Sequence, residues 1–306
     1  MTTIICIFCA CLLAVGIYFG AGYYVFRAFA FRNAKRAPAY RAPVDESPEK
    51  ERLLNLKNET LTLVTQDGLK LSGSLFPSGR NRGALALLAH GYLGSGKEHM
   101  APFAAYYLSR GIDVFLPDHR AHGKSEGKYI GFGETDAADC AAWCRYLAKK
   151  FPYYDRIILH GVSMGGATVD RAAADKNLPP QVCGVISDCA FSSCSEQFAH
   201  TLRHISPLLV PLLIPANFWF KRLGGYDIFS GGAAEGAAHS PLPFLFIHGA
   251  EDRFVPTAMG KELYRVCPDP GRVLWIVPGA KHFGSHTTDP EGYAAHLDAF
   301  LARLGL

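Results

Sequence analysis

Acidic residues are absent from the first 41 positions of this 306-residue chain, although 27 occur in the sequence as a whole. The same stretch holds five of the 31 lysines and arginines, which leaves 26 basic against 27 acidic side chains in the remainder. The basic surplus is therefore confined to one end, whereas a nucleic-acid-binding protein presents a basic face over its folded surface. We expect no nucleic-acid partner.

Charge of either sign is absent from residues 4–26. A helix of that length is about 34 Å long, which is enough to cross the hydrocarbon core of a bilayer. A cleaved signal peptide is the competing interpretation, but the segment lacks a basic start and its apolar run is too long. We therefore predict a transmembrane anchor over residues 1–26, which contacts the membrane through residues 4–26.

The basic residues nearest to this anchor all follow it in the sequence. Because positive flanks are retained on the cytoplasmic side, we expect a single-pass membrane protein whose folded part is cytoplasmic. Residues 27–56 are interpreted as a basic juxtamembrane linker, since the Ala-Pro pairs at 37–38 and 42–43 disfavour a helix. Residues 57–306 are then the folded domain. The five basic residues are Arg27, Arg32, Lys35, Arg36 and Arg41.

No disulfide framework is indicated, because the nine cysteines are odd in number and scattered through a long chain. Cys140 and Cys144 have the i, i+4 spacing of a metal-binding pair, but no second Cys or His pair lies near them in the sequence. Internal repeats and low-complexity segments are also absent. The sequence therefore predicts reduced thiols and implies neither a metal nor a cofactor.

Short apolar runs alternate with stretches of helical periodicity from residue 57 onward. A hairpin is expected first, because side chains alternate on both sides of the turn signal Asp67-Gly68. The later runs are continuously apolar, as in strands buried on both faces, so the alternation predicts a doubly wound, mostly parallel α/β sheet. Buried strands are expected at 84–89, 114–116, 157–159, 182–187, 244–247 and 273–277. Helices are expected at 102–110, 135–150, 165–174, 257–266 and 291–304.

The run Gly161-Val162-Ser163-Met164-Gly165 lies between a predicted strand and a predicted helix. A nucleophile on so tight a turn needs glycine two residues before and after it, where a Cβ would collide with backbone. Met164 would present a backbone N–H at the start of the helix. The pattern recurs by chance in proteins, but its place between strand and helix favours an activated serine over an inert glycine-rich turn.

A glycine turn, His90-Gly91-Tyr92, follows the predicted strand 84–89. It can direct the Tyr92 backbone N–H into the same site, where it would hold a tetrahedral oxyanion together with the Met164 N–H. The run 91–97 also resembles a phosphate-binding loop. It lacks the G-x-x-x-x-G-K-S/T spacing, so we favour the oxyanion interpretation.

An acidic residue and then a histidine follow the last two predicted strands. A serine hydroxyl becomes a good nucleophile when a base takes its proton and a carboxylate orients that base. Asp252 and His282 stand at the positions these roles require. The alternatives that remain open are Glu251 or Asp188 as the acid and His286 as the base.

Taken together, these runs resemble the α/β-hydrolase superfamily and, within it, the serine-aminopeptidase-like group that includes membrane-anchored serine hydrolases. The resemblance covers about residues 57–306 and includes the run 118–125, in which Ala121 replaces a common glycine. It implies an α/β-hydrolase fold and a role for His122 in fixing a loop. The implied site consists of Ser163 as nucleophile, His282 as base, Asp252 as orienting acid, and the backbone N–H groups of Tyr92 and Met164 as the oxyanion hole.

The resemblance also implies a small helical cap at about residues 189–241. Residues 205–220 within it are uncharged but interrupted by prolines, so they are too short and broken for a second membrane span. A buried pair of cap helices is the favoured interpretation of this segment. The functional alternative is an apolar lid in which Phe218, Trp219 and Phe220 face an acyl chain. With the anchor, this favours a small-molecule or lipid-like acyl substrate, cleaved as an ester or thioester.

Two other functions remain open. The same triad serves a peptidase or amidase, and the resembled group includes such enzymes. A catalytically inactive membrane scaffold could retain the fold alone. A scaffold would have no need of the serine, aspartate, histidine and both oxyanion turns together, so we favour the enzyme.

Overall fold

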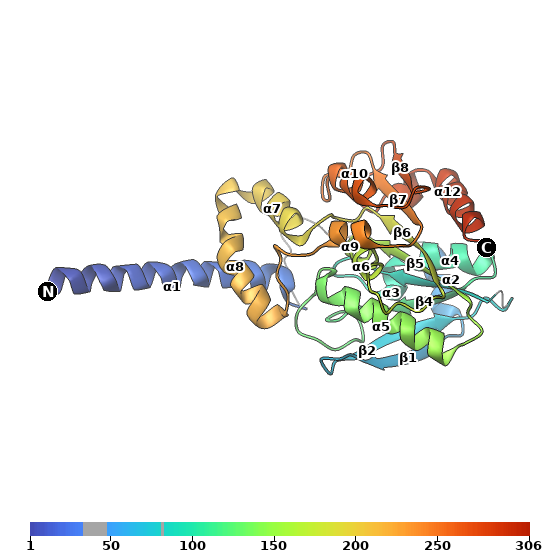
Figure 1. Cartoon of the computed structure of the whole chain (residues 1–306), viewed down its shortest axis with the longest axis horizontal. Coiled ribbons are helices and arrows are strands. Elements are labelled where there is room, and N and C mark those ends of the chain that lie inside the picture. The colour runs from blue at the N-terminus through green and yellow to red at the C-terminus, as the bar shows by residue number, and fades with distance from the viewer. Residues whose placement is uncertain (33–47, 81–82) are drawn as a thin grey trace.

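The computed structural model describes residues 1–32, 48–80 and 83–306, and its centre is one eight-stranded sheet in the order β1-β2-β4-β3-β5-β6-β7-β8 (Figure 1). The first two strands form the expected antiparallel hairpin, and β3 to β8 run parallel. This confirms the predicted α/β-hydrolase fold. The strands are β1 Glu59–Val64, β2 Lys70–Phe76, β3 Ala84–Ala89, β4 Asp113–Pro117, β5 Arg156–Val162, β6 Val182–Asp188, β7 Phe244–Gly249 and β8 Val273–Val277.

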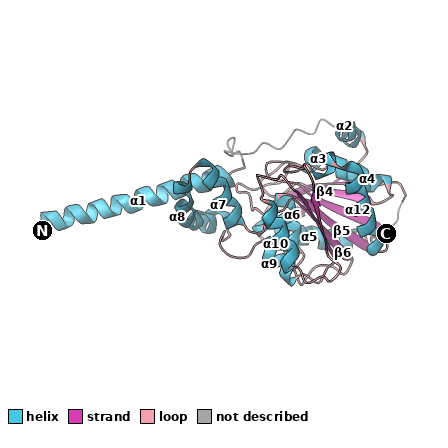
Figure 2. Ribbon diagram, turned by 90° about the horizontal axis from the view of Figure 1, so that it is seen from above, coloured by secondary structure: helices cyan, strands magenta, loops and turns pink. Residues whose placement is uncertain are grey.

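Helices cover both faces of the sheet (Figure 2). Successive residues of β3 point to opposite faces, so Leu87 joins one apolar cluster and Leu88 the other. Every residue of β3 is buried, which is the physical reason for its continuously apolar sequence. One cluster includes α5 Glu134–Lys150, α6 Met164–Ala172, α9 Ala233–His239 and α10 Thr257–Val266, and the other includes α4 Ala101–Ser109 and α12 Pro290–Arg303. Two short helices, α3 Gly96–His99 and α11 Ser285–Thr288, lie in the loops after β3 and β8.

The cap lies between β6 and β7 and consists of α7 Cys194–Ile205, η1 Pro207–Leu212, α8 Leu213–Trp219 and the π-helical turn η2 Phe220–Gly224. Pro207 occupies the first turn of η1, where a missing N–H costs nothing. The predicted cap extended to about residue 241, but α9 packs against α6 as part of the body. The cap proper therefore ends before α9.

Residues 218–220 all contact the N-terminal helix, which fits the buried cap helices better than the acyl-facing lid. Phe220 is fully buried, with its ring centroid 4.9 Å from that of Phe26. The Trp219 indole donates a hydrogen bond to the Phe19 carbonyl at 2.9 Å. These aromatic side chains join the cap to the N-terminal helix.

The N-terminal helix α1 extends from Thr2 to Ala30, four residues beyond the predicted end of the anchor at Phe26 (Figure 1). It continues because Phe29 and Ala30 are buried against the hydrolase domain. Phe31 then pairs with Tyr129 as an isolated β-bridge.

The predicted linker 27–56 is therefore ordered at both of its described ends. At its far end, α2 Pro48–Asn55 buries Leu53 against the body. Residues 33–47, the centre of this linker, lie outside the described residues, and so do Lys35, Arg36 and Arg41.

Candidate active site

Ser163 stands on a sharp turn between β5 and α6, with φ 58° and ψ −117°. A non-glycine residue at such dihedrals is strained, and the surrounding structure must hold it there. A Cβ on Gly161 would overlap the Gly165 carbonyl, and one on Gly165 would overlap the Ala89 carbonyl. Both glycines are thus required by close backbone contacts, for the physical reason predicted from the sequence.

Three side chains from separate strand ends meet at this turn. The His282 Nε2 atom lies 2.9 Å from Ser163 Oγ, and its Nδ1 atom lies 2.7 Å from Asp252 Oδ2. All three residues are buried. The geometry fits an imidazole that donates its Nδ1–H to the carboxylate and accepts the serine proton at Nε2.

Asp252 is held as an ionised acceptor. Its Oδ1 atom accepts backbone N–H groups from Phe254 at 2.9 Å and Val255 at 2.8 Å. Burial alone would raise the pKa of Asp252, but hydrogen bonds from His248 and His282 outweigh it and hold that pKa well below its ordinary value. The carboxylate therefore stays charged beside His282 at neutral pH.

The rival residues occupy other places. Glu251 is exposed, whereas Asp252 is buried. The Asp188 carboxylate accepts the Tyr293 hydroxyl at 2.9 Å, and burial raises the pKa of Asp188 to about 7. The His286 ring lies against Phe103 and Phe283, with centroids 4.9 Å and 5.3 Å away. The fold thus brings the His282 side chain to Ser163 and the Asp252 carboxylate to His282.

The loop after β3 lies beside the serine, as the oxyanion interpretation requires. A Cβ on Gly91 would be 3.5 Å from the Ser163 Cβ, so Tyr92 follows at the edge of the site. The next residue, Leu93, has φ 56° and donates its N–H to His122 Nε2 at 3.2 Å. Burial and the neighbouring His119 lower the pKa of His122 to about 4, so the ring is neutral and can accept this bond. This contact gives His122 the predicted loop-fixing position.

Sequence reasoning missed the contribution of α1 to this loop. The Tyr92 hydroxyl donates to the Phe29 carbonyl at 2.8 Å, and the Phe29 ring stacks on Phe198 of α7 at 4.5 Å. The Tyr92 ring in turn lies 5.0 Å from that of Phe132. The last turn of α1 therefore supports the candidate oxyanion loop. One sequence signal was available, because Phe29 is an apolar residue that lies beyond Arg27, outside the uncharged segment. Its partners could not be inferred, because they come from distant parts of the chain.

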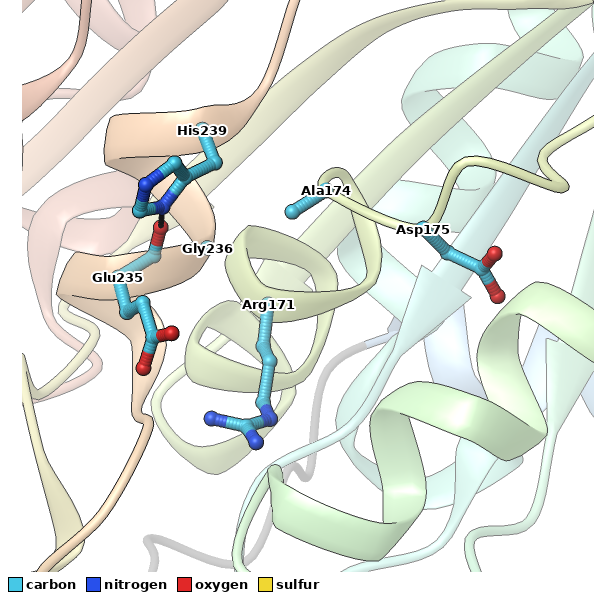
Figure 3. A pocket seen from close by; sticks show the side chains of 6 residues that line it. All are labelled: Arg171, Ala174, Asp175, Glu235, Gly236 and His239. Atoms are coloured by element: carbon cyan, nitrogen blue, oxygen red, sulfur yellow. Dashed lines mark hydrogen bonds between the residues drawn. The ribbon is translucent and has the colours of Figure 1, made fainter.

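Metal-binding arrangements of three or more His, Cys, Asp or Glu side chains do not occur within residues 1–32, 48–80 and 83–306. Cys140 and Cys144 are buried in α5. A separate hollow of about 350 Å³ opens between α6 and α9 (Figure 3). The wall of this hollow includes Arg171, whose guanidinium pairs with the Glu134 carboxylate at 2.9 Å. Ser163, Asp252 and His282 do not line the hollow.

Residues 80–219 match the family model described as serine aminopeptidase, S33. The structure is similar to that of an esterase from Pyrococcus furiosus, with a TM-score of 0.68 and 25% identity, over 86% of this chain and 96% of the esterase.

Sequence relatives extend this comparison. The uncharacterized Bacillus subtilis protein YqkD is 31% identical over 196 residues, 64% of each chain, so less than two thirds of that relative is spanned. The uncharacterized Saccharomyces cerevisiae membrane protein YNL320W is 28% identical over 250 residues, 81% of this chain and 80% of the relative. A Danio rerio lysophosphatidylserine lipase is 29% identical over 184 residues, 58% of this chain and 46% of the lipase.

Proposed function

Because this chain belongs to the α/β-hydrolase superfamily, we propose that it is a serine hydrolase that cleaves a carboxylic ester or thioester through an acyl-enzyme on Ser163. The observation that carries the proposal is the continuous chain of contacts from Ser163 through His282 to Asp252, at 2.9 Å and 2.7 Å. A buried hydroxyl, imidazole and carboxylate in this order supply a nucleophile, a base and an orienting charge.

The proposed reaction begins when Ser163 Oγ attacks the acyl carbon and His282 Nε2 takes the hydroxyl proton. The carbonyl oxygen becomes an oxyanion that the backbone N–H groups of Tyr92 and Met164 stabilise, each such donor being worth about 3–4 kcal/mol in other hydrolases. His282 then gives the proton to the leaving oxygen or sulfur, and the ester bond of the acyl-enzyme remains. A water molecule, deprotonated by His282, attacks that ester and releases the acid and free Ser163.

An apolar acyl group suits the surroundings of the site. The Phe254 ring lies 4.9 Å from that of His282, and Phe198 of the cap packs on Phe132 with ring centroids 4.8 Å apart. The similarity to an esterase and to a lysophosphatidylserine lipase supports a small-molecule or lipid-like ester. Hydrolysis rates on acyl esters of rising chain length test this, and a preference for acetyl esters would contradict it.

A peptidase or amidase is the second candidate, favoured by the family model's description as a serine aminopeptidase. The same triad can attack an amide, and the leaving amine would take its proton from His282. Matched ester and amide substrates with one acyl group separate the two activities. Faster turnover of the amide would replace the proposed esterase with this alternative.

Labelling with a fluorophosphonate probe tests for an activated serine. Wild type and Ser230→Ala, a change at an exposed serine, should be labelled equally, whereas Ser163→Ala should not be labelled. Labelling that persists in folded Ser163→Ala would refute the assignment. A folded wild type that resists the probe would favour the inactive membrane scaffold.

The apolar part of α1 is proposed as a single-pass membrane anchor. Its length and mean hydropathy of 2.6 are sufficient for a span. The similarity to a yeast membrane protein supports the same proposal. Arg27 follows the apolar segment, which favours a cytoplasmic catalytic domain.

A further inference from the structure

The cap exposes large apolar side chains on η1 and α8. Leu208 of η1 is 86% exposed, and Ile214 and Phe218 of α8 are 65% and 47% exposed. Ile214 and Phe218 are four residues apart, so they share one face of the helix. A folded domain in water buries side chains of this kind, and an exposed group of them indicates an interaction surface.

This apolar surface is continuous with that of α1. The Phe218 ring packs edge-to-face on Phe19 of α1, with centroids 5.3 Å apart. The Tyr18 hydroxyl donates to the Pro211 carbonyl at 3.3 Å. A Cβ on Gly22 would lie 2.6 Å from the Pro215 backbone, so the two helices approach as closely as backbones can. The cap is therefore fixed to α1 at the level of residues 18–22.

That level coincides with the edge of a membrane span. Residues 2–18 are exposed along their whole length and form about 26 Å of helix. A hydrocarbon core of about 30 Å takes about 20 residues, so a span beginning at Thr2 reaches Ala21. In both views, α7 and α8 lie between the free half of α1 and the sheet (Figures 1 and 2). The first part of the domain to meet the bilayer is thus the cap.

Exposed basic side chains lie on α1 and on the cap elements α7 and η2, next to η1 and α8 in the chain. Arg27 of α1, Arg203 of α7 and Arg222 of η2 are exposed. Lys221 is also exposed, although it pairs with Asp227 at 3.0 Å. Apolar side chains flanked by basic residues bind bilayers that contain anionic lipids.

We propose that Leu208, Ile214 and Phe218 insert into the bilayer that α1 spans, so that η1 and α8 form a membrane-docking surface. The occupant of this surface is the lipid itself. The docked cap would hold the site of Ser163 close to the adjoining leaflet, from which a lipid-like ester could enter it. This delivery role rests on the proposed function, whereas the docking itself does not.

Depth of insertion tests the docking without any reference to catalysis. The full-length chain, with exposed Cys6, Cys9 and Cys11 changed to serine, receives one cysteine at Ile214 or at Val64 of β1, and each of these residues is 65% exposed. An environment-sensitive fluorophore is attached to that cysteine, and the protein is placed in phosphatidylcholine–phosphatidylserine vesicles. Nitroxide groups on the lipid acyl chains quench any fluorophore that enters the hydrocarbon. The parent without either cysteine gives the background. The label at 214 should be quenched and blue-shifted, and equal quenching at 214 and 64 would overturn the proposal.

Substrate delivery is tested with Leu208→Glu/Ile214→Glu and the control Val64→Glu. The double variant should hydrolyse a vesicle-borne long-chain ester roughly tenfold more slowly, because carboxylates resist entry into hydrocarbon. Its rate on a soluble short-chain ester should equal that of wild type. An unchanged vesicle rate, or an equal loss on both esters, would overturn the delivery role. If wild type hydrolyses neither ester while position 214 is still quenched, the proposed function fails and the docking surface stands.

Discussion

Asp252 and Glu251 are neighbours in the sequence, yet their surroundings separate them. The turn after β7 buries Asp252 and gives its carboxylate two backbone N–H donors and the His282 imidazole, while Glu251 remains exposed. Asp252→Asn should lower kcat by roughly 10³- to 10⁴-fold, because an amide favours the wrong imidazole tautomer. Steady-state hydrolysis of a soluble ester measures this. Glu251→Gln is the matched control and should retain wild-type kcat, so a comparable loss in both variants would contradict the assignment.

Asp188 lies behind the turn that carries Ser163, where its backbone carbonyl accepts the Ser163 N–H at 2.8 Å. Burial raises the pKa of its carboxyl to about 7, above the ordinary 3.8. Between pH 4 and 7 the folded protein keeps a proton that the unfolded chain releases, so this group makes the protein less stable as pH rises through that window.

Asp188→Asn removes that titration while an amide oxygen can still accept the Tyr293 hydroxyl. The free energy of unfolding of the variant, minus that of wild type, should increase from pH 4 to 7 by a few kcal/mol and then level off. Urea unfolding in detergent micelles at several pH values provides the measurement. Glu98→Gln, at an exposed carboxylate, should show no such increase. A difference between Asp188→Asn and wild type that stays constant with pH would refute the expectation.

At the scale of elements, α1 has two parts with different neighbours. Residues 2–18 are exposed, whereas Val25, Phe26, Phe29 and Ala30 are buried in the main apolar cluster. Burying a large apolar side chain contributes about 1.5–3 kcal/mol, so the last two turns of α1 are a stabilising part of the hydrolase domain. The helix is consequently packed into the domain through its last two turns.

The contact between α1 and the loop after β3 makes a separate prediction. Tyr92→Phe removes the hydrogen bond to the Phe29 carbonyl and leaves the ring packed on Phe132. A hydrogen bond of this kind is worth about 1 kcal/mol, so kcat should fall by roughly fivefold as the loop loosens, with KM little changed. Tyr24→Phe, at an exposed ring of α1, is the control and should leave kcat unaltered. A wild-type kcat in Tyr92→Phe would show that α1 does not position this loop.

At the scale of the whole molecule, the orientation of the chain decides which compartment supplies the substrate. The basic residues that follow the apolar segment predict a cytoplasmic domain. Val64→Cys places a thiol on an exposed strand of the body, in a background where Cys6, Cys9 and Cys11 are serine. A membrane-impermeant maleimide should label position 64 only after intact cells are permeabilised. Labelling of unbroken cells would reverse the predicted topology.

Much of this architecture is already specified in the sequence. The apolar runs within β3, β5, β6 and β7 are almost wholly buried because both sheet faces are covered, so local pattern alone locates them. The edge strand β8 also has an apolar run, although most of its residues are only partly buried. Gly161 is likewise readable, since a Cβ there would meet Gly165 only four residues further on. The close contact at Gly165 is instead with the Ala89 carbonyl, far away in the sequence. The apolar part of α1 is evident from the absence of charge.

Tertiary structure decided what local pattern left open. The choice of Asp252 over Asp188, and of His282 over His286, depends on which side chains converge from strands far apart in the sequence. The burial of Phe220 against Phe26 also required two distant helices to meet, and this contact favours the buried cap over the acyl-facing alternative. Sequence alone determined the elements and the chemistry available at their ends. Packing between them determined which of those groups lie together, because such contacts follow from the positions of whole elements in space.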